Sequence, residues 1–145
     1  LRWINDTSTA HMSIVIVTIW RTLGYCVVVY LGAIQNISEE IIEAAHIDGA
    51  NAWQTTWKIT MPLVSPTTFM LLILQTISIM KLFTTIENMT GGGPGNATAN
   101  LPMMLYDYAS SRYQMGYASA IATILFFMMI GSNLLVTKIL RKVGS

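Results

Sequence analysis

The chain has 145 residues, of which 53% are hydrophobic and only 10% are charged, with a formal net charge of +1. Soluble domains usually carry about 25% charged residues, so this composition favours a protein in contact with lipid. The weak net charge and the lack of a basic block argue against nucleic-acid binding, and a single cysteine, Cys26, excludes an internal disulfide and a multi-cysteine metal site.

Three apolar stretches are long enough to cross a bilayer, whose hydrocarbon core needs about 20 helical residues. We predict spans at about 12–34, 66–86 and 117–137. Three buried helices of a soluble bundle are the alternative, but soluble helices carry a charged outer face. The stretch from Met12 to Gln35 holds one charge, and the stretch from Tyr117 to Thr137 holds none. The predicted fold class is therefore an all-α polytopic membrane protein.

In the first span, Thr18, Arg21, Thr22 and Tyr25 share one helical face. A cation near the middle of a span costs about 2.5–3.5 kcal/mol on insertion scales, so it normally faces protein or water. The second span has a broad polar side formed by Thr68, Gln75, Ser78 and Lys81. These faces are candidates for a solute pathway. The alternative is that the cations pair with neighbouring helices or extend to a membrane surface.

The segment between the first two spans, residues 38–63, has a mixed composition. Ser38 is a good N-cap for a short helix that runs to about Asp48, with Glu39 and Glu40 in the first turn, where the helix dipole favours negative charge. Ala45 and Gly49, four residues apart, give this helix a small face that would let another backbone approach closely.

A second helix is expected to follow at once. Asn51 with Gln54 resembles a capping box, and Trp53 with Trp57 forms an aromatic face suited to the membrane boundary. Pro62 is expected to end this helix, and Ser65 with Pro66 to begin the next span. The segment is thus predicted to be a helix-turn-helix with an acidic docking face. An ordinary amphipathic connecting loop is the alternative.

The linker 87–114 has two parts. GGGPGNATAN, residues 91–100, is predicted to be a flexible loop and lacks the Gly-Lys-Ser/Thr end of a phosphate-binding loop. Residues 101–113 could form a short interfacial helix. Neither His11 nor His46 has a second possible metal ligand at a suitable spacing in the sequence, so no metal site is predicted.

Basic residues in the flanks indicate the orientation of the spans. One side holds Lys58, Lys138, Arg141 and Lys142, and the other holds Arg2 and Arg112. Because the side with more basic residues is normally cytoplasmic, loop 38–63 and the C-terminus are predicted to be cytoplasmic, and loop 87–114 extracellular.

Residues 43–62 carry a resemblance. The pattern E-A-A-x3-G-x9-I-x-x-P, formed by Glu43, Ala44, Ala45, Gly49, Ile59 and Pro62, resembles the EAA loop of the membrane subunits of ABC importers. That family usually has Leu before the proline, where this chain has Met61, a swap that keeps volume and apolarity.

Other stretches resemble the carbohydrate-importer permeases of the maltose-transporter type. They are MKLFTTIENMTGGGP at 80–94, GYASAIATIL at 116–125, and RWIND with TIWRTLGY near the start. The resemblance implies the last three of about six spans. Because the chain begins with Leu1 and no signal peptide precedes the first apolar stretch, we expect it to be an internal or C-terminal piece of a longer protein.

The resemblance also implies partners and roles. Residues 38–63 would be a coupling helix that docks on a cytoplasmic ATPase dimer, with Glu43 meeting a basic group, Asp48 adding negative charge and Gly49 allowing a tight turn. ATP and magnesium would be bound by that ATPase, so this chain would be neither an enzyme nor a cofactor carrier. A second permease, an extracellular binding protein and a sugar substrate complete the implied assembly.

Substrate contacts are implied in two regions, near 20–25 and 78–82. The candidate pathway residues are Trp20, Arg21, Thr22, Tyr25, Gln75, Ser78, Lys81 and Leu82. Arg21 and Lys81 would also suit glycerol phosphate or another small polar solute in place of a sugar. A channel or structural membrane module with an incidental EAA-like loop remains the alternative from a different class.

Overall fold

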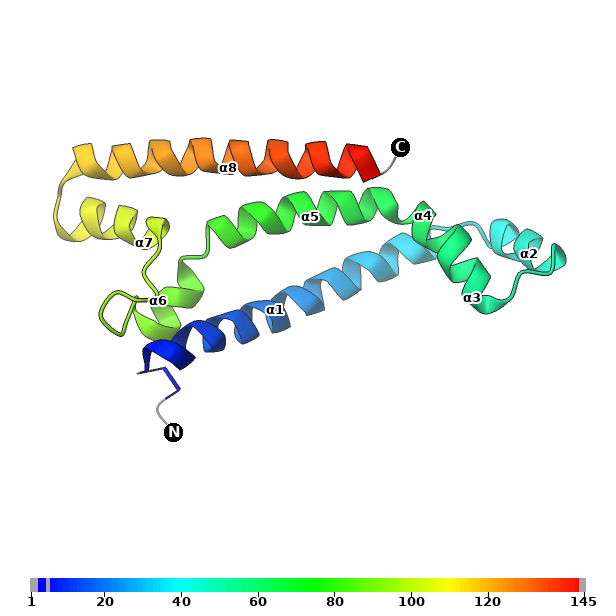
Figure 1. Ribbon diagram of the computed structural model, residues 1–145, viewed down its shortest axis with the longest axis horizontal. Helices are drawn as coiled ribbons and strands as arrows, with labels where there is room; N and C mark the ends of the chain where they lie inside the picture. Colours follow the sequence, from blue (N-terminus) through cyan, green and yellow to red (C-terminus); the bar gives the residue numbers. More distant parts are fainter. Residues whose placement is uncertain (1–2, 5, 144–145) are drawn as a thin grey trace. The chain divides into compact units, whose positions relative to one another are not determined.

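A computed structural model describes residues 3, 4 and 6–143, and every regular element within them is helical (Figure 1). The predicted all-α class is therefore confirmed. In chain order the elements are α1 (Thr7–Gln35), α2 (Glu39–Ile47), α3 (Ala52–Thr55), η1 (Thr56–Thr60), α4 (Met61–Leu63), α5 (Ser65–Met80), α6 (Thr84–Thr90), α7 (Leu101–Tyr106), η2 (Asp107–Ser111) and α8 (Met115–Val143).

The contacts divide the chain into two compact units. One unit is Thr22–Leu72, which contains α2, α3, η1 and α4. The other consists of the described residues up to Arg21 and from Ile73 onward, which include α6, α7, η2 and α8. The helices α1 and α5 each contribute residues to both units.

Two helices, α1 and α8, are long and apolar enough to cross a membrane by themselves. Each has 29 residues, which corresponds to about 43 Å of helix, against a hydrocarbon core of about 30 Å. The predicted spans 12–34 and 117–137 lie inside these two helices, which are apolar and of spanning length. That these segments cross a membrane stays a prediction.

The predicted second span, 66–86, is wrong at its C-terminal end. The helix α5 stops at Met80 after 16 residues, or about 24 Å, and a break at residues 81–83 separates it from α6. A residue distant in the sequence contacts this break: the side-chain amide of Asn100 donates a hydrogen bond to the carbonyl of Leu82. A backbone carbonyl that leaves a helix within a membrane needs such a partner.

The helical segment before α5 forms a bent pair with it. The helical stretch Ala52–Leu63 passes the span criteria together with α5, although the two are bent by 57° at the junction. The stretch contains the π-helical turn η1, where the Met61 N–H donates to the Thr56 carbonyl. Pro62 has no N–H to donate, and the wider turn just before it accommodates that missing bond. The helix ends at Leu63, one residue beyond the predicted end at Pro62.

The stretch GGGPGNATAN, expected to be a flexible loop, instead forms a hydrogen-bonded turn. Gly91 ends α6 in the left-handed conformation with φ of 55°. Thr98 lies at the centre of the turn and is 5% exposed. Its hydroxyl donates to the Gly93 carbonyl at 2.9 Å and lies 2.8 Å from the Thr90 hydroxyl, while its N–H donates to the Gly92 carbonyl. Sequence composition alone does not show these bonds, because they depend on which carbonyls the turn brings together.

Replacing Thr98 with Val is expected to loosen this turn. Valine keeps the shape but removes the hydroxyl, which leaves the Gly93 carbonyl without this donor, while the Thr90 hydroxyl keeps its bond to the Ile86 carbonyl. Each buried polar group left unsatisfied costs about 1–3 kcal/mol. We expect faster proteolysis between residues 91 and 100 in the full-length protein in membranes. Thr98→Ser keeps the hydroxyl and serves as the control, so equal proteolysis of the two variants would contradict this account.

The expected helix in 101–113 is present as α7 and η2. Asn100 caps α7, because its side-chain oxygen accepts from the Met103 N–H. Figure 1 shows α7 folded back alongside α8, and the Tyr108 and Tyr117 rings stack at 5.3 Å. Arg112 forms an ion pair with Asp107 at 2.7 Å. The interfacial location of this helix stays a prediction.

Candidate functional site

The predicted helix-turn-helix is present as α2, a turn at residues 48–51, and α3. The α2 helix ends in a Schellman motif, in which the Ala50 N–H donates to the Ala45 carbonyl at 2.9 Å and the Gly49 N–H donates to the His46 carbonyl at 3.0 Å. Gly49 has φ of +79°, which side chains other than glycine rarely adopt, and an added Cβ there would meet nothing within 4 Å. Glycine is therefore required by the backbone conformation of the turn and not by crowding within this chain.

The start of α2 differs from the prediction in one detail. Ser38 occupies the N-cap position, but its side chain makes no capping hydrogen bond. Glu39 and Glu40 do lie in the first turn, as predicted, where the helix dipole stabilises negative charge.

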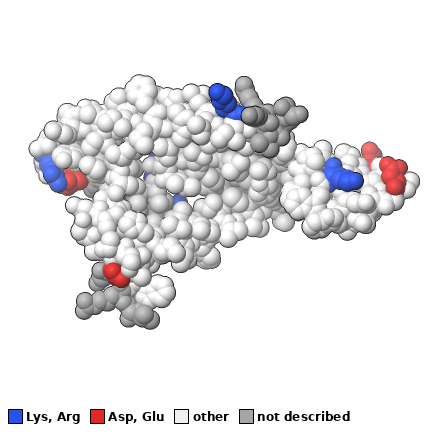
Figure 2. Space-filling view, viewed as in Figure 1, with Lys and Arg blue, Asp and Glu red and all other residues white. Residues whose placement is uncertain are grey.

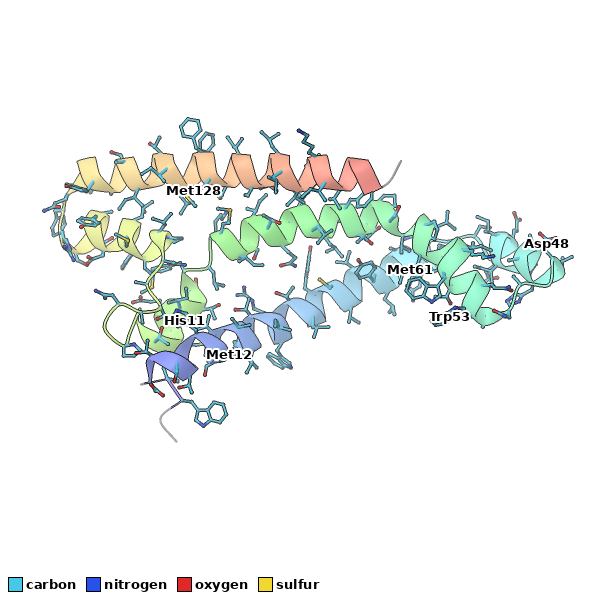
Figure 3. The ribbon with its side chains drawn as sticks, in the orientation of Figure 1. His11, Met12, Asp48, Trp53, Met61 and Met128 are labelled. Carbon is cyan, nitrogen blue, oxygen red and sulfur yellow. The ribbon has the colours of Figure 1, made fainter. Side chains whose placement is uncertain are left out.

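The capping box that begins α3 is confirmed. The Gln54 N–H donates to the Asn51 side-chain oxygen, and the Asn51 N–H donates to the Gln54 side-chain oxygen, both at 2.9 Å. The rings of Trp53 and Trp57 are 5.4 Å apart and both are exposed, so the predicted aromatic face is present. Figure 3 shows Trp53 on α3 and Asp48 at the turn beyond α2.

The two alanines of the motif have different environments. Ala44 is exposed, whereas Ala45 is only 6% exposed within the unit. The small face of Ala45 and Gly49 was expected to receive another backbone. Ala45 is instead covered by its own chain, so it cannot contribute surface to docking in this conformation. Its burial indicates that its small side chain serves the packing of the unit.

Ala45→Leu is expected to destabilise the hairpin by about 1–3 kcal/mol, because extra methyl groups in a closely packed site force neighbouring atoms apart. Ala44→Leu is the matched control, since Ala44 is on the same helix but exposed. The measurement is hydrogen exchange of the α2 and α3 amides in the full-length protein in nanodiscs. Equal exchange rates in the two variants would contradict the packing role of Ala45.

The hairpin carries an exposed acidic surface. Its members, all exposed, are Glu39, Glu40, Glu43 and Asp48. Figure 2 shows acidic side chains gathered over this part of the unit, with a basic side chain beside them. Glu43 and Glu39 also line a hollow of about 450 Å³ together with Ile42 and Thr60. Of the remaining motif residues, Ile59 is half-buried and Pro62 is exposed.

A separate polar cavity lies in the other unit, where α5 ends and α6 begins. It has a volume of about 350 Å³, and four of the predicted pathway residues line it: Arg21, Ser78, Lys81 and Leu82. The Arg21 guanidinium donates to the Thr85 hydroxyl at 3.4 Å, which is a long hydrogen bond. Arg21 is supplied by α1 and the other three by α5 and the break that follows it.

Four other pathway predictions are not brought into this cavity. Trp20 is 78% exposed and, like Gln75, is not among the lining residues. Thr22 and Tyr25 belong to the other compact unit. Thr18 uses its hydroxyl locally, since it donates to the Ile14 carbonyl at 2.7 Å.

Sequence reasoning missed five residues that line the cavity: Leu74, Ile77, Phe83, Thr84 and Thr85. Phe83, Thr84 and Thr85 were predicted to lie inside a continuous second span. The break after Met80 instead turns them toward Arg21 and Lys81. The signal that could have found them is the pair of threonines directly after a cation at the end of an apolar run.

Comparison with known proteins gives one family match over nearly the whole chain. The model for "Binding-protein-dependent transport system inner membrane component" matches residues 2–145.

Individual relatives share about a third of their residues with the chain. The multiple sugar-binding transport system permease protein MsmF of Streptococcus mutans is 36% identical over 133 residues, covering 92% of this chain and 46% of the relative. The starch degradation products permease protein AmyD of Thermoanaerobacterium thermosulfurigenes, described as probable, is 35% identical over 127 residues, covering 88% and 44%. The trehalose/maltose permease protein MalF of Thermococcus litoralis is 32% identical over 141 residues, covering 97% and 48%. The chain thus spans a little under half the length of these relatives.

Proposed function

The chain belongs to the family of binding-protein-dependent transport system inner membrane components, and we propose that it forms the later spans of a permease that imports a sugar. The observation that carries this proposal is the family match over residues 2–145, together with an acidic hairpin that has the EAA pattern. The three relatives above are named for sugars or sugar products, which supports a saccharide as the cargo.

In this proposal the two sites have different tasks. The hairpin of α2 and α3 binds a separate ATPase subunit, and ATP hydrolysis there is transmitted through η1 and α4 to α5. The cavity of Arg21, Ser78, Lys81 and Leu82 is part of the solute pathway. Alternating access of this pathway, with a second permease subunit and an extracellular binding protein, moves the solute inward.

The proposed orientation places the hairpin and the end of α8 in the cytoplasm and residues 87–114 outside. It is supported by Lys58 beside the hairpin and Lys138 near the end of α8, since basic residues favour the cytoplasmic side. The acidic residues of the hairpin do not oppose this, because acidic residues contribute little to orientation.

The test is uptake by proteoliposomes that contain the full-length permease, its partner permease and the ATPase. We expect uptake of a sugar mixture to require both ATP on the ATPase side and the binding protein on the other side. A channel would move solute down its gradient without either. Uptake that is independent of ATP would therefore reject the importer and favour the channel, and an ATPase that does not co-purify would reject the coupling role of the hairpin.

A further inference from the structure

The cavity between α1, α5 and α6 is positively charged. Two of its lining residues, Arg21 and Lys81, are cations, and none of its lining residues is acidic. Within the described part of the chain, the one ion pair joins Arg112 to Asp107, so neither cavity cation has a carboxylate within ion-pair distance. Both cations can donate hydrogen bonds to the hydroxyls of a neutral sugar, but their positive charges add attraction only for an anionic ligand.

Both cations retain the capacity to bind an anion. Arg21 is exposed, and its recorded side-chain hydrogen bond goes to Thr85 at 3.4 Å, which uses one of the five guanidinium donors. Lys81 is also exposed. A guanidinium matches the paired oxygens of a phosphate, sulfonate or carboxylate, and an ammonium adds a point charge beside it.

The rest of the lining suits a sugar ring. Ser78, Thr84 and Thr85 offer hydroxyl groups that both donate and accept, which is what the hydroxyls of a sugar require. Leu74 and Ile77 supply apolar surface for the C–H faces of the ring. The part of the cavity formed by this chain has a volume of about 350 Å³, within the range for small-molecule sites, and has room for a single sugar ring.

A structural explanation accounts for only one of the two cations. Lys81 directly follows the last residue of α5, where the negative end of the helix dipole stabilises a positive charge. Arg21 is in the middle of α1, fourteen residues before its end at Gln35, so the end of its own helix gives it no such role. An anionic ligand bound between the two residues would give both cations the same role.

We infer that the cargo of this pathway is a monosaccharide-sized sugar that carries an acidic group, with the acid held between Arg21 and Lys81. The inference rests on the proposed import function and assigns the substrate class of the same cavity. Phosphate, sulfonate and carboxylate share the necessary charge and oxygen geometry, so the acid is specified here by that common chemistry.

The experiment is competitive uptake by the reconstituted full-length importer with its binding protein. The probe mixture contains glucose, glucose 6-phosphate, glucuronate and a sulfonated glucose, each distinguished by mass after uptake. We expect uptake of at least one acid at ten times or more the rate of glucose. The preferred acid distinguishes among phosphate, carboxylate and sulfonate.

The variants Arg21→Gln and Lys81→Gln are each expected to lower acid uptake at least about tenfold, because each removes one charge-assisted contact. Arg112→Gln is the matched control, since it removes a cation that is paired with Asp107 and lies outside the cavity. It is expected to leave uptake within about twofold of the unmodified protein.

Hydrolysis of ATP stimulated by the binding protein is measured in the same vesicles. Where that stimulation is present and glucose is taken up as fast as the acids, or no acid is taken up, the importer stands and the acidic cargo is rejected. Acid uptake that is unaffected by both Gln variants also rejects the assignment. Where stimulation itself is absent, the proposed function fails first and the acidic cargo fails with it.

Discussion

Replacing Gly49 with Val is expected to reduce co-purification of the ATPase with the full-length permease to less than about a tenth. The turn after α2 needs φ of +79° at this position, and a β-branched residue there is a severe conformational outlier. Adopting a left-handed conformation costs an ordinary residue about 1–2 kcal/mol, and valine more. The Schellman bonds from Ala50 and Gly49 would then be lost, and α2 would no longer be held against α3.

Gly49→Asn is the control that identifies the cause. Asparagine is close to valine in size but tolerates the left-handed conformation. If conformation is what matters, the Asn variant should retain more than about a third of the co-purified ATPase. If glycine is needed instead because the ATPase backbone passes close to it, both variants should fail alike. The φ of +79° at Gly49 favours the conformational cause.

Local signals predicted the elements that depend on local chemistry. The positions of α1 and α8 follow from their apolar runs, although both helices extend beyond the predicted spans. The start of α3 follows from Asn51 and Gln54, whose reciprocal bonds need only three residues of separation. The tight turn at Gly49 was implied by the family resemblance, and the positive φ there gives its physical reason.

Features set by distant residues were not predictable in this way. The break after α5 is bonded by Asn100, whose side-chain amide donates to the Leu82 carbonyl from eighteen positions away in the sequence. The apolar pattern of a sequence contains no information about that contact. The second span was therefore predicted to continue through the break, and Thr84 and Thr85 were not predicted to line the cavity. The burial of Ala45 is of the same kind, because it is set by packing within the unit and not by the pattern of α2 alone.

Reversing the charge of Glu43 is expected to remove the ATPase as completely as Gly49→Val, but without disturbing the hairpin. Glu43 is exposed and lines the hollow of about 450 Å³, so its carboxylate is available to a cation inserted from a partner. Losing one charge-assisted contact in such a hollow costs about 1.5–3 kcal/mol, and placing a like charge there costs more. We therefore expect Glu43→Gln to weaken ATPase binding about tenfold, and Glu43→Lys at least about thirtyfold.

Glu40→Lys provides the matched control for this result. It makes the same change in net charge at an exposed position on the same helix, but Glu40 does not line the hollow. If the hollow receives a specific basic side chain, the Glu40 variant should bind the ATPase within about threefold of the unmodified permease. If the acidic surface acts only through its overall field, both reversals should weaken binding to a similar extent, and raising the salt concentration should weaken binding of the unmodified permease in the same proportion. Binding measured for the three proteins at two salt concentrations therefore separates a defined contact at Glu43 from general attraction by the acidic face of α2.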